Sequence, residues 1–190
     1  MPRFVCLDFE TNGFPTKGAP RHEWTLPFCS YPIQLSVDIV DEGVVHHAYD
    51  ALIRGATQLA PWVRENVPIT LNDLHEKGKS IHNVIVDLAT LLQEGDTVVA
   101  HNAAFDLDTV LGRTSRRLGI DTPELERILT APRFCTMRCA YSKVTFSKQP
   151  KMQDLRNHFE VRLKNAHDAR GDSAGLAACV AEAWRRGVML

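Results

Sequence analysis

The sequence predicts an α/β fold in which helices flank a mixed β-sheet. Short apolar, β-branched runs typical of buried strands open the chain, and longer segments with apolar residues at helical spacing follow. One early connection suits a hairpin, whereas a later strand is reached through helices, so antiparallel and parallel pairs should share one sheet. At 190 residues the chain has the size of one domain, and we expect residues 1–190 to form it.

The expected strands are short, apolar and rich in β-branched residues. They are Arg3–Phe9, Ile33–Val40, Val44–Ile53 and, after a turn at Gly95, a segment ending at Ala100. Asp41-Glu-Gly43 has the composition of a hairpin turn between the second and third strands. Residues 11–31 are rich in Gly and Pro, and a loop of this length in a compact domain is often functional.

Helices are expected where apolar residues recur at helical spacing. They are Pro61–Asn66, Thr70–Lys77, Ile81–Leu92, Ala104–Leu118, Met152–Phe159 and Asp168–Trp184. Ile81–Leu92 carries the clearest apolar stripe, which indicates packing against the core. The helix that begins at Ala104 should stop at Gly119, because glycine favours the C-terminal end of a helix.

Composition excludes some classes of protein. The longest run without a charged residue, Trp24–Val37, is 14 residues, shorter than the roughly 20 apolar residues that a membrane-spanning helix needs. The N-terminus lacks the pattern of a secretory signal, and five cysteines without a regular spacing indicate reduced thiols. We therefore expect an intracellular, cytoplasmic protein. The net charge of -1 does not indicate a nucleic-acid-binding protein. A neutral total is nevertheless compatible with basic residues gathered in one region of the surface.

Four carboxylates and a histidine stand at the expected ends of strands and helices. Asp8 and Glu10 are two apart in the first strand, so both project from one face. Asp106 follows the fourth strand, and His167 and Asp172 open the last helix. Each has an ordinary explanation when taken alone: a solvated strand end, an acid near the positive end of a helix, or a capping residue.

Taken together, the three motifs are far more specific. Asp8-Phe-Glu10-Thr-Asn-Gly13, His101-Asn-x-x-Phe-Asp106 and His167-x-Ala-x-x-Asp172 occur in this order along the chain. The combination resembles the DEDDh family of 3′–5′ exonucleases, the group with the proofreading epsilon subunit of bacterial DNA polymerase III, the three-prime repair exonucleases and ribonuclease T. The resemblance covers nearly the whole chain and implies a ribonuclease H-like fold.

The resemblance also implies two divalent cations, Mg²⁺ or Mn²⁺, held by carboxylates. Asp8 would bridge both ions. Glu10 and Asp172 would complete the site of the ion that activates water, and Asp106 would support the second ion. Two cations can stabilise the attacking and leaving oxygens of phosphodiester hydrolysis at once. His167 would be the general base, because an imidazole with a pKa of about 6.5 can take a proton from water near neutral pH.

Four further residues are expected to bind the substrate. By resemblance, the backbone of Thr11 would hold the terminal 3′-hydroxyl, and Asn102 and Phe105 would line the same pocket. Phe14 could stack on a base, which suits an enzyme without sequence preference. The alternative for Phe14 is a loop anchor that packs on the core.

Other polar residues have weaker signals. Residues that could line the groove for the strand are Lys17, Arg21, His22, Trp24, Lys143, Lys148 and Lys151, although surface lysines are commonly only solvated. Cys135 and Cys139 are four apart and could share a helix face, but no second pair follows to complete a zinc site. His46 and His47 are interpreted as non-catalytic residues on opposite faces of a strand.

The sequence thus predicts a 3′–5′ exonuclease that releases nucleoside 5′-monophosphates from single-stranded DNA or RNA 3′ ends. DNA is favoured, because Asp-Phe-Glu-Thr with a following Gly looks closer to the proofreading and repair branches. A homodimer or a small subunit of a larger nucleic-acid-processing complex is possible. Two alternatives stay open: a catalytically inactive relative that binds nucleic acid or acts as a scaffold, and an unrelated α/β domain whose acids are solvated.

Overall fold

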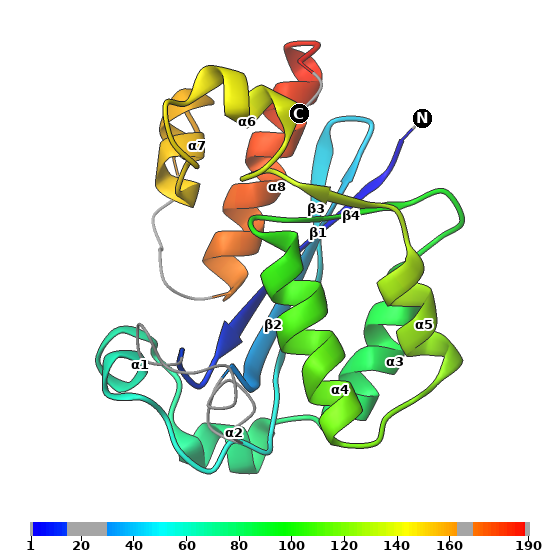
Figure 1. Cartoon of the computed structure of the whole chain (residues 1–190), viewed down its shortest axis with the longest axis vertical. Helices are drawn as coiled ribbons and strands as arrows, with labels where there is room; N and C mark the ends of the chain where they lie inside the picture. The colour runs from blue at the N-terminus through cyan, green and yellow to red at the C-terminus, as the bar shows by residue number, and fades with distance from the viewer. Residues whose placement is uncertain (1, 15–29, 163–168, 189–190) are drawn as a thin grey trace.

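A five-stranded mixed sheet forms the centre of the molecule (Figure 1). The computed structural model describes residues 2–14, 30–162 and 169–188. In the order in which they pair, the strands are β3 (Val44–Leu52), β2 (Pro32–Asp41), β1 (Phe4–Thr11), β4 (Thr97–Ala100) and β5 (Arg133–Cys135). β3, β2 and β1 pair antiparallel, whereas β1, β4 and β5 pair parallel. The predicted mixed sheet is therefore confirmed.

The hairpin between β2 and β3 forms where Asp41-Glu-Gly43 predicted it. Glu42 and Gly43 have φ values of 51° and 76°, and positive φ at both central residues is the requirement of a tight turn that follows the twist of the strands. β1 runs two residues further than its apolar composition indicated, and includes Glu10 and Thr11. This extension keeps Asp8 and Glu10 in one regular strand.

The helices lie on both faces of the sheet and at one of its ends. They are α1 (Pro61–Asn66), α2 (Leu71–Lys77), α3 (Ile81–Leu91), η2 (Ala104–Gly112), α4 (Arg113–Arg117), α5 (Pro123–Thr130), α6 (Ala140–Thr145), α7 (Met152–His158) and α8 (Ala169–Arg185). α8 packs on the face that Cys6 and Val40 present, together with Val99. α3, η2 and α5 pack on the opposite face. No helix in the described ranges is long and apolar enough to cross a membrane.

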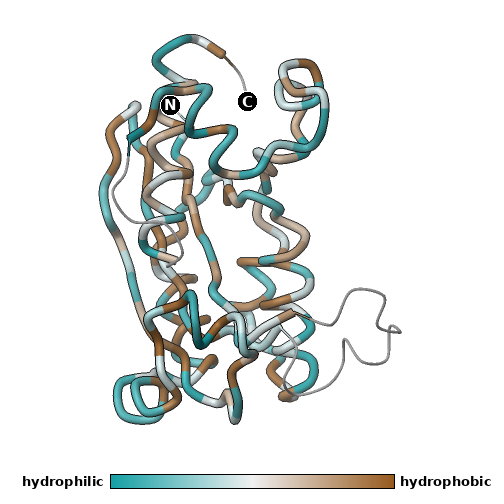
Figure 2. The backbone as a smooth tube through the Cα atoms, turned by 90° about the vertical axis from the view of Figure 1, so that its left-hand side faces the viewer, coloured by the Kyte–Doolittle hydropathy of each residue, from teal (hydrophilic) through white to brown (hydrophobic). Residues whose placement is uncertain are grey.

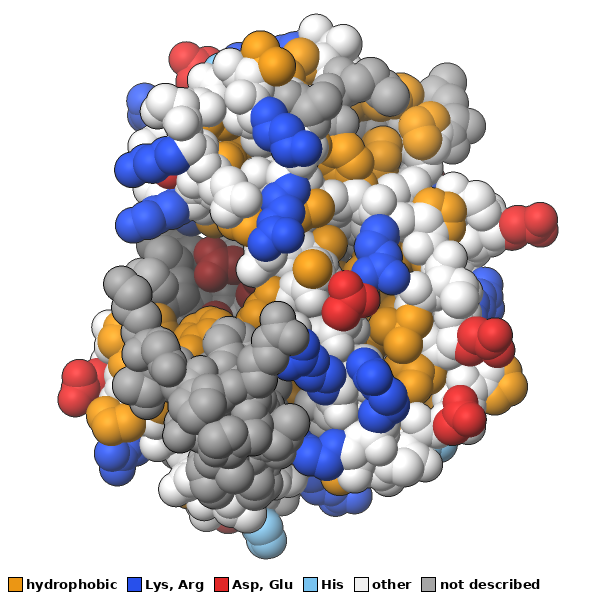
Figure 3. Space-filling model, viewed as in Figure 1, with side chains coloured by type: hydrophobic (Ala, Val, Ile, Leu, Met, Phe, Trp, Pro, Cys, Tyr) orange, Lys and Arg blue, Asp and Glu red, His pale blue; other side chains and the backbone are white. Residues whose placement is uncertain are grey.

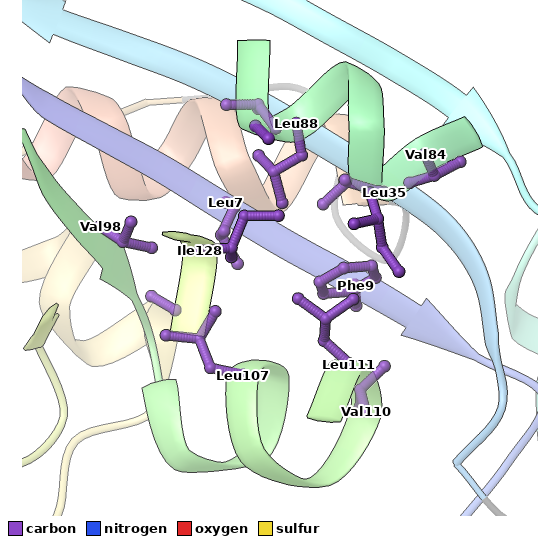
Figure 4. Packing of buried hydrophobic residues seen from close by; sticks show 14 of the residues in the cluster. Leu7, Phe9, Leu35, Val84, Leu88, Val98, Leu107, Val110, Leu111 and Ile128 are labelled. Carbon is purple, nitrogen blue, oxygen red and sulfur yellow. The ribbon is translucent and has the colours of Figure 1, made fainter. Parts of the chain in front are cut away.

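The larger core lies between the sheet and α3, η2 and α5. Figure 4 shows Leu7 and Phe9 of β1 beside Leu35 of β2, with Leu107 and Leu111 of η2 facing them. Full burial of one such side chain contributes roughly 1.5–3 kcal/mol, so this layer supplies much of the stability. Hydrophobic residues accordingly run through the middle of the molecule, whereas many of the turns at its ends are hydrophilic (Figure 2).

One predicted helix has an unexpected geometry. The segment from Ala104 is helical up to Arg117 and stops before Gly119, as predicted, but its first nine residues form π-helical turns. The N–H of Arg113 donates to the carbonyl of Asp108, five residues earlier. Such turns are rare in proteins, and those that occur often lie at functional sites. Here they contain Asp106.

The region between residues 120 and 150 was not assigned from the sequence. It contains α5, β5 and α6. β5 and α6 are too short to show a clear period, whereas α5 has Leu125 and Ile128 on one buried face after the N-cap Thr122, a signal that the sequence did contain. The suggestion that Cys135 and Cys139 share a helix face is wrong. Cys135 ends β5, and Cys139 precedes α6, where its Sγ accepts from the N–H of Ser142 at 3.4 Å.

Candidate active site

Three carboxylates from opposite ends of the chain meet beside the sheet. Ligand atoms of Asp8, Glu10 and Asp172 all lie within 4.8 Å of one another, and the three side chains are half-buried. Alternation along β1 places Asp8 and Glu10 on the face that α8 covers, while Phe9 points into the core on the other side. Asp172 lies in the first turn of α8. Three carboxylates this close together repel one another unless a cation lies between them.

Asp106 approaches the same strand at the edge that β4 leaves open. β4 pairs with β1 only along Phe4–Cys6, and further along β1 the N–H of Phe9 donates to Asp106 Oδ1 at 3.3 Å. The pKa of Asp106 is raised to about 7, mainly by burial and in part by the charge of Glu10, and the hydrogen bond from the N–H of Phe9 opposes this rise. Asp106 is not among the three carboxylates that share the 4.8 Å cluster. It is a separate buried carboxyl beside them.

A polar stripe on β2 fixes the start of α8. Gln34, Ser36 and Asp38 alternate along the strand and are all buried. Gln34 Oε1 accepts the N–H of Ala169, the first residue of α8, at 3.3 Å. Ser173 Oγ donates to Asp38 Oδ2 at 2.6 Å and lies 2.9 Å from Ser36 Oγ. Because Ser173 follows Asp172 directly, these bonds set the position of the third carboxylate.

The sequence analysis missed this stripe. The sequence did contain a sign of the stripe, because polar residues occupy every second position of a strand whose other residues, such as Ile33 and Leu35, are apolar. Such an alternation ordinarily indicates a solvated face, whereas here it lies against a helix. His47 also reaches the stripe: its Nδ1 lies 3.2 Å from Asp38 Oδ1. The prediction that His46 and His47 are non-catalytic is not tested by these contacts.

The chain turns sharply after β1, next to the carboxylates. Thr11 is buried, and the pairing of β1 with β2 shifts register between Glu10 and Thr11. Asn12 fixes the turn, because its side chain accepts the N–H of Tyr31 at 2.9 Å and its carbonyl accepts the N–H of Ala60 at 2.8 Å. Gly13 has a φ of 141°, and a Cβ there would lie 2.6 Å from Ala60 Cβ, so only glycine fits.

Two of the expected substrate-binding aromatics form a pair beside this turn. The rings of Phe14 and Phe105 have centroids 5.2 Å apart and are tilted by 33°. Phe105 is half-buried against the core, whereas Phe14 is 63% exposed. Phe14 is therefore not buried as a loop anchor would be. Asn102 has a φ of 96°, a strained conformation for a residue other than glycine, and its carbonyl accepts the N–H of Phe105 at 2.7 Å.

His101 joins the second motif to a distant segment. Its Nε2 lies 3.0 Å from the carbonyl of Pro150 and its Nδ1 lies 2.9 Å from Thr136 Oγ1. A carbonyl can only accept, so Nε2 carries a proton and donates it. Burial lowers the pKa of His101, which favours the neutral ring. His101 is the first residue of the second motif, and no role was predicted for it from the sequence.

Several predicted residues lie outside the described ranges. They are Lys17, Arg21, His22, Trp24 and the candidate general base His167. The structure thus brings together Asp8, Glu10 and Asp172, places Asp106 against the same strand, and leaves the position of His167 as a prediction.

The donor set suits a hard divalent cation. The three clustered groups offer only carboxylate oxygens, which Mg²⁺ and Mn²⁺ prefer, and no thiolate or imidazole of the described residues joins them in the cluster. Their spacing allows each to contribute one ligand atom to a shared ion. The arrangement can therefore hold a metal beside a turn with an exposed aromatic ring.

The sequence of this chain matches one protein family. A family model described as Exonuclease matches residues 5–179, which include Asp8, Glu10, Asp106 and Asp172. No curated protein sequence matches the chain significantly.

Solved structures resemble the whole chain in fold. Exonuclease X in complex with 5′ overhanging duplex DNA is 19% identical, with a TM-score of 0.66 over 100% of this chain and 95% of that one. A 3′-exonuclease that recognises the histone mRNA stem-loop is 14% identical, with a TM-score of 0.74 over 97% and 82%. E. coli exonuclease I with a dT13 oligonucleotide is 17% identical, with a TM-score of 0.71 over 98% of this chain but 42% of that one. The ribonuclease H-like prediction is confirmed, and the chain belongs to the exonuclease family, as an enzyme of the DEDDh 3′–5′ type that its motifs resemble.

Proposed function

We propose that this protein removes nucleotides from the 3′ end of single-stranded DNA by a two-metal-ion mechanism and releases nucleoside 5′-monophosphates. The observation that carries the proposal is the meeting of Asp8, Glu10 and Asp172, which are far apart in sequence, within 4.8 Å. One fold unit spanning residues 1–190 would contain the whole site, since its carboxylates come from both ends of the chain.

The four carboxylates would hold the ions. Asp8, Glu10 and Asp172 would offer their oxygens to one ion, because their ligand atoms lie within 4.8 Å of one another, and Asp8 would also serve the other ion. Asp106, set apart and buried, would support the second. When bound, the two cations would stabilise the charge that develops on the attacking and leaving oxygens of the phosphodiester. Their positive charge would also favour the ionised form of Asp106, against the effect of its burial.

The remaining residues of the site would bind and orient the strand. The buried turn at Thr11, fixed by the bonds of Asn12, would offer its backbone to the terminal 3′-hydroxyl. The last base would lie beside Phe105, and the exposed ring of Phe14 would stack on a base without reading its identity. Asn102, held in a strained conformation, would line the same pocket.

His167 would accept the proton of the attacking water. An imidazole near neutral pH has the required basicity, and the start of α8 lies beside the carboxylates because of the polar stripe on β2. His167→Ala should therefore lose roughly 10²–10⁴-fold in turnover and keep its metal-dependent thermal shift. Retention of near-wild-type turnover would mean that the histidine only caps the helix.

RNA is the competing substrate. The first motif and the DNA complexes of exonuclease X and exonuclease I support DNA. The histone mRNA 3′-exonuclease has a TM-score of 0.74, as high as that of the DNA enzymes, and supports RNA.

Matched DNA and RNA strands of one sequence, labelled at the 5′ end and digested with Mg²⁺, test the proposal. We expect a ladder that shortens from the 3′ end, faster for DNA, and survival of a circular single strand. Efficient cutting of the circle would exclude the terminal pocket, and activity in excess EDTA would exclude the metal mechanism. Absence of any cleavage by the wild type would favour the inactive binding or scaffold relative.

A further inference from the structure

The stretch from Thr136 to Lys151, here called the basic segment, contains four cationic residues and no acidic residue. The chain as a whole has 22 basic and 23 acidic residues, so positive charge is concentrated here. The cations are Arg138, Lys143, Lys148 and Lys151, and all are exposed. Within the described parts of the chain, none of the four forms an ion pair. Their charge is therefore not neutralised by neighbouring residues of the described structure.

Both ends of the basic segment are fixed to the second motif. His101 Nδ1 accepts from Thr136 Oγ1 at 2.9 Å, and His101 Nε2 donates to the carbonyl of Pro150 at 3.0 Å. Inside the segment, Ser142 Oγ donates to the carbonyl of Thr136 at 2.5 Å. Since His101 directly precedes Asn102 and follows β4, the segment is held at the edge of the candidate active site rather than on a remote surface.

The surface around the site shows the same separation of charge. Figure 3 shows acidic side chains set back in a hollow, with Lys and Arg side chains along its upper rim. A polyanion that approaches the hollow is repelled by the carboxylates and attracted by the rim. Val144 is 89% exposed beside Lys143 on α6, so an apolar side chain is also available to contact a sugar or a base.

We propose that the basic segment is a second binding surface, which holds the phosphates of a single DNA strand upstream of the nucleotide in the active site. This inference rests on the proposed function. Lysine and arginine side chains neutralise phosphates without reading the sequence, and each contact releases counterions. A strand held in this way stays near the carboxylates after each cleavage, so the surface should matter for long substrates and not for minimal ones.

A pair of double variants tests the proposal. Lys143→Gln with Lys148→Gln removes two charges from the basic segment and leaves Lys151, the N-cap residue of α7, unchanged. The control is Lys77→Gln with Lys79→Gln, which removes two exposed lysines from the region of α2, at the other end of the molecule (Figure 1). Their surface ion pairs are worth little, roughly 0–1 kcal/mol each.

Binding of poly(dT) is measured over a range of salt concentrations, with Ca²⁺ in place of Mg²⁺ to prevent cleavage. We expect the first double variant to bind about 10-fold more weakly at low salt and to lower the slope of log K against log salt by about 1.4, roughly 0.7 for each lost contact. The control should match the wild type. An unchanged affinity and slope in the first variant would overturn the proposal.

A minimal substrate separates this inference from the proposed function. The p-nitrophenyl ester of thymidine 5′-monophosphate has no upstream strand, and the first double variant should hydrolyse it at the wild-type rate. Loss of that activity would place the lysines in the reaction itself and would overturn an upstream role. If the wild type hydrolyses neither substrate, the proposed function fails, while the binding measurement still tests the surface.

Discussion

The two faces of strand β2 hold their neighbouring helices by different means. Leu35 and Val37 face the large apolar core shared with α3, η2 and α5. Gln34, Ser36 and Asp38 face α8 and bind it through Ala169 and Ser173. Apolar burial is strong but non-directional, whereas hydrogen bonds fix distance and angle. The apolar face therefore supplies stability, and the polar face sets the register of the helix that carries Asp172.

The comparison predicts that activity and stability can be separated. The largest effect should come from the site itself. Asp8→Asn should lower the rate of hydrolysis by several orders of magnitude, because a carboxylate ligand of the metal site is lost. It should also remove the Mg²⁺-dependent rise in melting temperature. Calorimetry with and without Mg²⁺, beside a digestion assay, measures both.

On the apolar face, Leu35→Ala should destabilise the fold by about 2–5 kcal/mol, because it leaves a cavity in a fully buried layer. The Mg²⁺ concentration for half-maximal activity should not change at a temperature where the variant is folded. Urea unfolding and a metal titration check the two statements. A large change in metal affinity would show that the apolar face also positions the ligands.

The buried carboxyl of Asp106 should make the metal-free protein depend on pH. Its pKa is about 7 in the fold and about 3.9 in an unfolded chain, so the folded state binds the extra proton between these values. The contribution of Asp106 to stability should therefore be greatest below pH 4 and fall as pH rises towards 7, by up to about 4 kcal/mol at 1.36 kcal/mol per unit.

Asp106→Asn is the matched control for this effect. In EDTA, its unfolding free energy should lose the decline between pH 4 and pH 7 that the wild type shows. Mg²⁺ should weaken the decline in the wild type, because a cation favours the ionised carboxylate. Identical pH profiles for the two proteins in EDTA would mean that Asp106 is already ionised in the folded protein between pH 4 and pH 7, so that its pKa is not raised.

The smallest change in stability should come from the polar face. Ser173→Ala removes a hydrogen bond and leaves Asp38 with one donor fewer, at a cost of about 1–3 kcal/mol. Unlike Leu35→Ala, it should raise the Mg²⁺ concentration for half-maximal activity. Ser173→Thr retains the hydroxyl and should restore metal affinity. If Ser173→Ala and Leu35→Ala behave alike in the metal titration, the stripe has no positioning role.

Much of the fold could be predicted from local patterns. Strand alternation placed Asp8 and Glu10 on one face, and helical periodicity located α3, α7 and α8 to within a residue or two at their ends. The hairpin at Glu42 and Gly43 followed from its turn residues. The short elements α5, β5 and α6 were not found. β5 has three residues and pairs with β4, so its regular structure depends on a tertiary contact. α5 did carry a local signal, because Thr122 and Pro123 precede apolar residues at helical spacing.

The sequence by itself indicated the candidate residues of the site, in three acidic motifs with a fixed order, and the periodicity of an α/β fold. Only the tertiary structure decided how these residues meet. It brought Asp172 to the carboxylates of β1, set Asp106 apart in a buried position against the N–H of Phe9, and turned a polar stripe on β2 into the support of α8. Periodicity reports which face of an element is buried, but a hydrogen bond between residues 38 and 173 depends on packing that no local pattern records.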